Sequence, residues 1–573
     1  MPARALIVAG LYVAIDILAG PTLTAAESSP APNRASESVV LQFPADRSLG
    51  VVTIVDAEPD QERIVARGDV QLPRGKKFRL DLSRAAADLS CLHDMPRLGL
   101  VALDCRNDKL LPEILRIEGL ESLSIGGSVD DQAMASLAGM TSLSELVITA
   151  ESVTEEGLYK LAPLRLKRLR LVNMKLNDDC LLAIAKFEKL ESLSLINFNG
   201  FGKQEIGDTG IAQLRDLTRL ETLNLQGTRL TDTGLASLSG LENLKSLNIS
   251  GTLVTNDGLK YLAGMRNLTT LEVDAQGVND AGLAHIVLRK HLQRLKLRVI
   301  TSDAAFEQIS KLAELRELEA TIYNTSDAGW ENLEKLPALD SLRIAGLGVN
   351  DGAMTQIGRL PAIKKLAISF ATVTDEGMAN VANLRNLERL SIYSVPITCD
   401  GLRSLAALEK LRWLSLGDIA GMGRDGLAVL ADAPSLELIN LSNGSDPVKE
   451  ILEDQLVHLA RLPKLRFLQL SNIETTDRGA NVLGQFPAIK ELWFDRSCAH
   501  LTDAGLQDLA RLERLTRLGA GGTFTRHGLD ALAQAKNLEY LILATAGVSP
   551  PDADEFRKAT AGRIALDLEK PPR

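Results

Sequence analysis

The sequence predicts an α/β solenoid, a horseshoe with a parallel β-sheet on its concave face, short helices on its convex face and a small N-terminal β cap. An apolar pattern, LxxLxL, recurs at steps of mostly 23–24 residues and gives about 20 repeats. Within a repeat, the apolar period changes from two, as in strands, to three and four, as in helices. Because one repeat cannot bury both its leucine sets alone, neighbouring repeats must stack into a continuous core.

The second apolar position of the LxxLxL pattern places each expected strand. The stretch "LETLNLQGTRLTDTGLASL", residues 220–238, is the clearest repeat. Helices occupy more room than strands, so the stack should curve with the sheet inside. The segments "KFRLDL" and "RIALDL" are expected to open and close the array. The strand positions are Val101, Leu123, Leu146, Leu169, Leu193, Leu223, Leu247, Leu271, Leu295, Leu318, Leu342, Leu366, Leu390, Leu414, Ile439, Leu468, Leu492, Leu518 and Leu541.

A threonine, often followed by an acid and a glycine, precedes many of the expected helices. Its hydroxyl can accept a backbone N–H as an N-cap, and the acid (Asp232, Asp375, Asp477, Asp503) suits the positive end of the helix dipole. The glycines (Gly234, Gly258, Gly282, Gly377) are expected to leave room where the helix meets the strand layer. A cluster repeated this often is structural, and no active site is inferred from it. The threonines are Thr154, Thr231, Thr255, Thr374, Thr398, Thr476, Thr502 and Thr525.

Charge and cysteine content exclude several classes of protein. The 64 basic and 74 acidic residues are spread along the chain, which argues against a nucleic-acid-binding face. The five cysteines are far apart, no CxxC occurs and the histidines lack metal spacing, so neither a zinc site nor a disulfide framework is expected. Cys91 and Cys105 could form a disulfide with each other. The alternative is that the cysteines are buried small apolar residues or free thiols. No cofactor is predicted.

The N-terminal composition predicts a processed, exported chain. Residues 1–26 have the features of a signal peptide: Arg4, an apolar run over residues 5–19 and the small residues 24–26. An uncleaved amphipathic segment is the alternative. Residues 27–37 are a Ser/Pro/Ala linker, 38–75 the β cap, 76–568 the solenoid and 569–573 a tail. We therefore expect a periplasmic, cell-surface or secreted protein without a membrane span in the mature chain.

The repeat unit resembles the leucine-rich repeats of the ribonuclease-inhibitor-like and cysteine-containing subclass over roughly residues 78–568. With the preceding β segment, the chain is also similar to exported bacterial leucine-rich-repeat proteins. Thr228, Thr252 and Thr523 occupy positions where that subclass often carries Cys or Asn, whose side chains bond the turn backbone between coils, while Met174, Gln276 and Leu347 depart from this. The resemblance implies a binding scaffold without naming a ligand.

Motifs for catalysis are missing from the sequence. It has no GxGxxG on a strand-to-helix turn, no Walker motif, no HExxH and no GxSxG, so no enzyme is expected. The stretch "LLPEILRI", residues 110–117, resembles the opening of an F-box, but it lies between two close strands and is interpreted as an ordinary convex helix. The Arg67-Gly68-Asp69 tripeptide is attributed to chance.

Aromatic residues gather at inward-facing positions of the C-terminal strands and form the predicted ligand-binding site. We call this set, Tyr393, Trp413, Phe467, Trp493 and Tyr540, the concave aromatic patch. Exposed aromatics dominate binding hot spots, although mutual packing across the sheet is the alternative. Two insertions, residues 196–208 and 442–454, should project from one rim, and the second should border the patch.

Charged residues also line the predicted concave face, where opposite charges on adjacent strands should pair and add solubility. They are Glu272 and Asp274, then Arg294, Lys296 and Arg298, then Glu317 and Glu319. Together these features predict a non-catalytic exported scaffold that recognises a protein on its concave face. Its oligomeric state is left open. Alternatives are a glycan-binding envelope protein, a structural spacer and an F-box-like receptor of a ubiquitin ligase.

Overall fold

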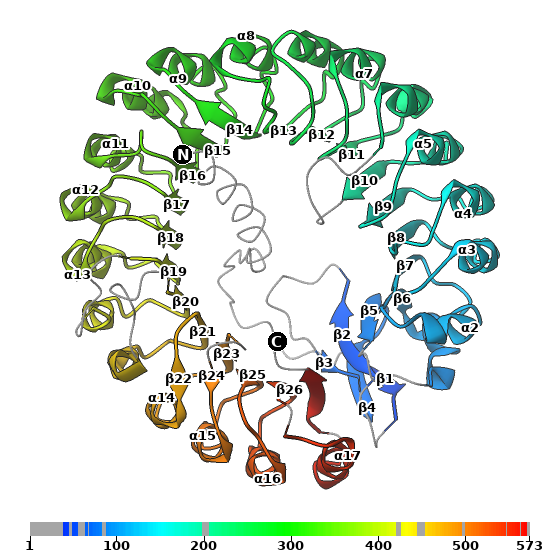
Figure 1. The fold of residues 1–573 in the computed structure, drawn as a ribbon, viewed down its shortest axis with the longest axis vertical. Helices are drawn as coiled ribbons and strands as arrows, with labels where there is room; N and C mark the ends of the chain where they lie inside the picture. The colour runs from blue at the N-terminus through cyan, green and yellow to red at the C-terminus, as the bar shows by residue number, and fades with distance from the viewer. Residues whose placement is uncertain are drawn as a thin grey trace.

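The computed structural model confirms the predicted fold class. Short helices line the outside of a nearly closed ring, and parallel strands line its inside (Figure 1). The structure describes residues 38–44, 49–55, 64–66, 68–82, 88–196, 205–419, 426–443, 453–495, 499–545, 547–561 and 563–569.

The strands are β1 (Ser38–Gln42), β2 (Gly50–Ile54), β3 (Ile64–Val65), β4 (Asp69–Pro73), β5 (Phe78–Leu82), β6 (Leu100–Cys105), β7 (Ser122–Gly126), β8 (Glu145–Thr149), β9 (Arg168–Val172), β10 (Ser192–Ile196), β11 (Thr222–Asn224), β12 (Ser246–Asn248), β13 (Thr270–Val273), β14 (Arg294–Ile300), β15 (Glu317–Ile322), β16 (Ser341–Ala345), β17 (Lys365–Ser369), β18 (Arg389–Tyr393), β19 (Trp413–Gly417), β20 (Leu438–Ser442), β21 (Phe467–Ser471), β22 (Thr475–Thr476), β23 (Glu491–Phe494), β24 (Ala499–His500), β25 (Arg517–Gly521), β26 (Tyr540–Ala544) and β27 (Ala565–Glu569).

The helices are α2 (Leu111–Ile114), α3 (Asp131–Leu137), α4 (Glu155–Lys160), α5 (Asp178–Ile184), α6 (Asp208–Ile211), α7 (Asp232–Ser237), α8 (Leu283–Ile286), α9 (Asp303–Ile309), α10 (Asp327–Glu331), α11 (Asp351–Ile357), α12 (Asp375–Ala379), α13 (Cys399–Leu402), α14 (Asp477–Leu483), α15 (Asp503–Leu509), α16 (Arg526–Ala533) and α17 (Pro550–Ala559). Short 3₁₀ turns complete the convex side: η1 (Ser90–Leu92), η2 (Met95–Leu98), η3 (Asp108–Leu110), η4 (Ala212–Asp216), η5 (Gly258–Gly264), η6 (Asp280–Gly282), η7 (Asn332–Lys335), η8 (Asn380–Asn383), η9 (Arg403–Ala407), η10 (Ala428–Asp432) and η12 (Glu453–Arg461).

The strand register matches the predicted leucine positions from Leu123 to Leu541, and Leu541 pairs onward with Leu566 of β27. The first position is wrong. Leu103, and not Val101, is the partner of Leu123. The LxxLxL pattern fits this segment at two positions, as Leu98, Val101 and Leu103 or two residues later as Leu100, Leu103 and Cys105, and the later alignment continues the ladder.

The β cap joins the solenoid through β5. This strand runs antiparallel to β2 and parallel to β6, so it belongs to both parts. Strands β1 and β4 form a separate antiparallel pair. The predicted signal peptide and linker, residues 1–37, lie outside the described residues, as does Arg67 of the tripeptide.

The core is a stack of leucines between the strand and helix layers. Leu247 of β12 is fully buried, as are its neighbours in register, Leu223 and Leu271. Trp330 of α10 is also fully buried and packs against Phe306, with ring centroids 4.8 Å apart. Removing water from such apolar surface contributes about 25 cal/mol per Å², so the stacking of coils is the main source of stability.

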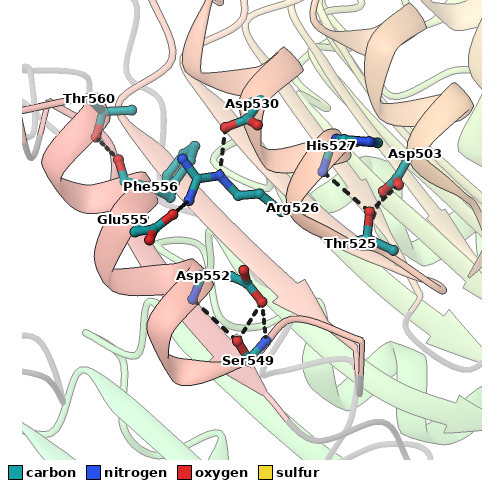
Figure 2. A network of polar contacts seen from close by, with 10 residues as sticks. All are labelled: Asp503, Thr525, Arg526, His527, Asp530, Ser549, Asp552, Glu555, Phe556 and Thr560. Carbon is teal, nitrogen blue, oxygen red and sulfur yellow. Dashed lines mark hydrogen bonds and ion pairs between the residues drawn. The ribbon is translucent and has the colours of Figure 1, made fainter.

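An acidic residue at the start of many helices and 3₁₀ turns connects one coil to the next, a link that the sequence analysis did not predict. The carboxylate of Asp232 accepts the Thr255 backbone N–H at 2.8 Å through Oδ1 and the Thr255 hydroxyl at 2.7 Å through Oδ2. Asp503 makes the same two contacts with Thr525 (Figure 2). The other pairs of this kind are Asp131–Thr154, Asp208–Thr231, Asp280–Thr301, Asp351–Thr374, Asp375–Thr398 and Asp477–Thr502; Glu453 replaces the aspartate in one coil, and Ser326 replaces the threonine opposite Asp303 in another.

The threonine hydroxyls also cap their own helices, as predicted, at most of the expected positions. Thr231 accepts the Thr233 N–H at 3.2 Å, and Thr525 accepts the N–H of His527 (Figure 2). Thr374 begins α12 without a side-chain cap. Its hydroxyl donates to Asp351, as in the other pairs.

The predicted role of the glycines needs a correction. A Cβ at Gly258 would lie 2.1 Å from Asp232 Oδ1, and one at Gly234 would lie 2.3 Å from Asp208 Oδ1. The glycine therefore leaves room for the carboxylate of the preceding coil rather than for the strand layer. The motif T-D-x-G is a connector between coils in which each residue has a separate task.

Two of the three turn threonines bond the turn backbone, but within one coil and not between coils as the resemblance implies. The buried hydroxyls of Thr228 and Thr252 donate to the carbonyl oxygens of Leu225 and Ile249 at 2.8 and 2.7 Å. Thr523 is exposed, and Phe524 fills the interior there. Those two bonds stay within one coil, so they tighten the turn and do not link neighbours.

The remaining structural expectations concern cysteines and the F-box-like segment. Cys105 is a buried free thiol, so the alternative Cys91–Cys105 disulfide is not formed. Burial raises the pKa of the Cys105 and Cys180 thiols, which makes both poor nucleophiles. The segment "LLPEILRI" forms one short convex helix, α2, and buries Ile114 and Ile117.

Candidate functional site

The inner surface of the ring is built from three rows of side chains. On each strand, residues alternate between the buried leucines and the concave face, because successive side chains point to opposite sides. The first row precedes the first core leucine, the middle row lies between the two, and the last row follows the second. On β19 these residues are Trp413, Ser415 and Gly417, with Leu414 and Leu416 buried between them.

Trp413 and Phe467 lie in the first row, on β19 and β21. Leu438 of β20 lies between them in register, so three large apolar side chains occupy consecutive strands. All three are half-buried. The sequence analysis considered only aromatics and missed Leu438, although its place directly before Ile439 gives the same row.

Trp493 and Tyr540 form a second group. Trp493 is in the middle row of β23, and a Cβ on Gly519 of β25 would lie 2.4 Å from its ring. The Trp493 and Tyr540 rings are 6.5 Å apart at 52°, and the Tyr540 hydroxyl donates to Asp567 at 2.9 Å. Much of the apolar surface of Trp493 and Tyr540 is therefore covered by contacts within the sheet itself.

Tyr393 lies apart from both groups, in the last row of β18. Its ring covers Gly417 of β19 and meets Phe370 edge to face at 5.7 Å between centroids. Burial and the nearby Asp418 raise the pKa of the Tyr393 phenol, so it stays neutral and can donate a hydrogen bond. The five residues of the concave aromatic patch therefore lie in three separate groups: Trp413 with Phe467, Trp493 with Tyr540, and Tyr393 alone.

The predicted charge ladder forms ion pairs across β13–β16. Glu317 pairs with Arg294 at 2.7 Å, and Asp274 faces Arg298 at 3.8 Å. Glu319, almost buried, pairs with Lys296 at 3.0 Å and Arg343 at 3.2 Å. In these contacts, acidic and basic side chains of β13–β16 offset one another's charge on this part of the concave face.

The concave face of β16–β21 has a different character. Its three rows contain Arg343, Lys365 and Arg389, and none of the row positions on these six strands carries a carboxylate. From β17 to β21, small or uncharged polar residues fill the middle row, including Ser391, Ser415, Asn440 and Gln469. The apolar row of Trp413, Leu438 and Phe467 adjoins Arg389 in register.

Three further features bear on the site: the predicted rim loops, groups of metal ligands and membrane-spanning helices. Most of the two predicted rim loops, residues 197–204 and 444–452, is not described. Across the described ranges, no group of three or more His, Cys, Asp or Glu side chains is arranged to hold a metal ion. No helix within those ranges is long and apolar enough to cross a membrane.

Comparison with known families agrees with the solenoid geometry. A family model described as a leucine-rich repeat region matches residues 286–561, and a second, described as a leucine rich repeat, matches residues 217–239 and 240–263. A fold of stacked strand–turn–helix coils with a leucine ladder defines the class of repeat scaffolds. Within that class, the chain is a leucine-rich-repeat protein. No curated protein gives a significant match.

Solved structures give remote similarities. An internalin, inlF, from Listeria monocytogenes is 18% identical over 72% of this chain and 93% of its own, with a TM-score of 0.31. The plant peptide hormone receptor RGFR1, in complex with RGF2, is 14% identical over 83% of this chain and 92% of its own, with a TM-score of 0.32.

Proposed function

We propose that this protein is a non-catalytic, exported scaffold that binds a protein partner on the concave face of β18–β26. The observation that carries the proposal is the row of Trp413, Leu438 and Phe467 on three neighbouring strands, half-buried on the face opposite the core. Large apolar side chains on a surface away from the core favour a binding role. The five aromatics Tyr393, Trp413, Phe467, Trp493 and Tyr540 remain the proposed contact residues.

A rigid sheet explains how such a site would work. The strands are fixed by the core on one side and by their neighbours in the ladder, so the side chains above them lose little conformational entropy on binding. We also propose membership of the ribonuclease-inhibitor-like subclass and cleavage of the signal peptide before Glu27. N-terminal sequencing of the native protein tests the cleavage, and an intact Met1 in the native protein would contradict it.

The test of the proposed function is affinity capture from the native extract. Wild-type protein is compared with a Trp413→Ala/Phe467→Ala variant and with Arg170→Ala, a control on the concave face of β9. We expect a partner retained by wild type and by the control and lost by the double variant. The melting temperature of the double variant should stay close to wild type, whereas Leu247→Ala should cost about 2–5 kcal/mol through a core cavity.

Three other outcomes would change the assignment. Equal capture of the partner by all three proteins would show that the concave aromatic patch does not bind it. Retention of the wild type on polysaccharide columns, lost in the double variant, would favour the glycan-binding alternative, since aromatic rings can stack on sugars. Unfolding of the double variant would show that these residues serve the core.

A further inference from the structure

The edge of the ring at the carboxyl ends of β15–β18 carries large apolar side chains on four consecutive coils. Tyr323 directly follows β15, and Leu347 lies two residues beyond β16, with 39% and 67% of their surface exposed. Phe370 directly follows β17, is half-buried and meets Tyr393 of β18 edge to face. We call Tyr323, Leu347, Phe370 and Tyr393 the apolar rim patch. Exposed apolar side chains gathered on neighbouring coils are typical of an interaction surface.

The segments that carry the apolar rim patch contain no charged residue, although charged residues make up 24% of the whole chain. Charge returns in the coils on either side, at Arg298 in β14 and at Asp418 beyond β19. Acids also border the convex side, where Asp351 and Asp375 begin α11 and α12. An uncharged surface with an acidic border favours an uncharged, apolar ligand over an anionic one. The charge-free segments are residues 321–326, 345–350, 369–374 and 393–398.

The local backbone holds Leu347 away from the core. A Cβ on Gly346 would lie 2.7 Å from the Ile322 carbonyl oxygen, and a Cβ on Gly348 would lie 2.9 Å from it. The Gly348 N–H donates to the same oxygen at 2.9 Å. The turn is therefore pressed against the preceding coil on both sides of Leu347. Val349 of this turn is fully buried, so the core is filled without Leu347, whose side chain is left in solvent.

Phe370 has a backbone conformation that bulky residues rarely adopt. Its φ is 51°, in the left-handed region. In the neighbouring coils, the residue at this place donates its N–H in the same way to the last residue of the next strand, and it is Gly346, Ser394 or Asp418. Glycine and short polar residues tolerate this region better than an aromatic residue does. Strain of this kind gathers at functional sites, which favours a binding role for the ring.

The chemistry of the apolar rim patch favours a protein segment as its ligand. Leu347 lies on the coil between those of Tyr323 and Phe370, and its branched side chain offers a sugar neither a flat ring nor a hydrogen bond. The acidic border and the net charge of −10 oppose an anionic membrane surface. Neighbouring strands are about 4.8 Å apart, so four coils span about 14 Å, which about four or five residues of extended peptide cover.

We propose that the apolar rim patch is a second docking surface, which takes an uncharged protein segment through its leucine or aromatic side chains. This surface goes beyond the concave row of Trp413 and Phe467 and does not depend on it. Tyr393 belongs to both the apolar rim patch and the concave aromatic patch, so it stays unchanged in the variants that test them.

Selection from a displayed library of random 12-residue peptides tests this surface. The library is panned on four full-length proteins: wild type, the rim variant Leu347→Ser/Phe370→Asn, the concave variant Trp413→Ala/Phe467→Ala, and the control Leu253→Ser. Leu253 is 59% exposed on the same edge, outside the charge-free segments. Peptides enriched on wild type should be uncharged and contain leucine or aromatic residues. Their affinity should fall about tenfold or more in the rim variant, stay unchanged in the other two and vary little with salt.

Thermal melting separates a binding role of Phe370 from a structural one. Asn173 occupies the same place after β9, with a φ of 54°, so asparagine suits this backbone. Phe370→Asn alone should therefore melt at or above the wild-type temperature while losing peptide affinity. A lower melting temperature would show that Phe370 serves the fold through its contact with Tyr393, and would overturn its place in the site. Leu347→Ser, at a side chain outside the core, then carries the binding test alone.

Several results would overturn the proposal. Peptides that depend on Trp413 and Phe467, and bind the rim variant as well as wild type, overturn the rim surface and leave the proposed function standing. No enrichment on wild type, or enrichment of charged peptides whose binding falls as salt rises, also overturns it. Binding to phosphatidylcholine vesicles, or self-association in sedimentation, that is lost in the rim variant would replace the protein segment with a membrane or a second copy of this chain.

Discussion

At the scale of single residues, the T-D-x-G motif shows how a repeat can look catalytic while acting as a connector. Thr255 caps its own helical turn and donates to Asp232 of the previous coil, and Gly258 leaves the space that this carboxylate needs. In the same coil Asn256 replaces the acid, and its Oδ1 accepts the N–H of Asn279 in the next coil at 3.0 Å. The bond needs an oxygen at this position and does not need a charge.

Gly258→Ala tests the space requirement of this connector. The new methyl would sit 2.1 Å from Asp232 Oδ1, so the carboxylate must move and its two bonds to Thr255 weaken. We expect a loss of about 1–3 kcal/mol and faster hydrogen exchange around α7 and η5. Gly240→Ala is the matched control, because its Cβ would meet nothing within 4 Å. Equal stability of the two variants would refute the interlocking role.

At the scale of secondary-structure elements, strand β15 carries two acids with different surroundings. Glu317 and Arg294 form a partly solvent-exposed pair, whereas Glu319 is nearly buried between Lys296 and Arg343. Removing the charge of Glu319 would leave two partly buried cations, Lys296 and Arg343, without their shared carboxylate.

Glu319→Gln should therefore destabilise the protein by about 1–3 kcal/mol, while Glu317→Gln should cost about 0–1 kcal/mol. Urea unfolding of the two variants beside wild type measures the difference. High salt should reduce the effect of Glu317→Gln more than that of Glu319→Gln, because exposed charges are screened more strongly. A larger loss for Glu317→Gln would contradict the assigned burial of this pair.

The elements also show what the sequence could and could not predict. Repetition determined the strand alignment at most positions, and it failed at β6, where the LxxLxL pattern fits either Leu98, Val101 and Leu103 or, two residues later, Leu100, Leu103 and Cys105. The link from Asp232 to Thr255 was missed because it joins positions one repeat apart and produces the same pattern as simple capping. The patch was predicted as one set of aromatics, but Gly417 and Gly519 let Tyr393 and Trp493 lie flat across neighbouring strands.

At the scale of the whole molecule, each coil contacts chiefly the coils beside it, so stability should be distributed along the ring rather than shared equally. The last coil protects the C-terminal edge. Strand β27 pairs with β26, and Phe556 of α17 is fully buried. The capping box at Ser549 and Asp552, with the contact between Arg526 of α16 and Glu555 of α17, holds this coil in place (Figure 2).

Removing residues 546–573 tests this local distribution of stability. The truncation strips β26 of its partner, exposes Leu541 and Leu543 at the edge, and removes the Asp567 acceptor of the Tyr540 hydroxyl. We expect hydrogen-exchange protection to fall steeply in β25 and β26, with increased self-association, while β12–β14 keep their protection. The wild-type chain measured in parallel is the control. Equal loss of protection at β12–β14 would show instead that the ring unfolds as one cooperative unit, so that every coil depends on its C-terminal closure.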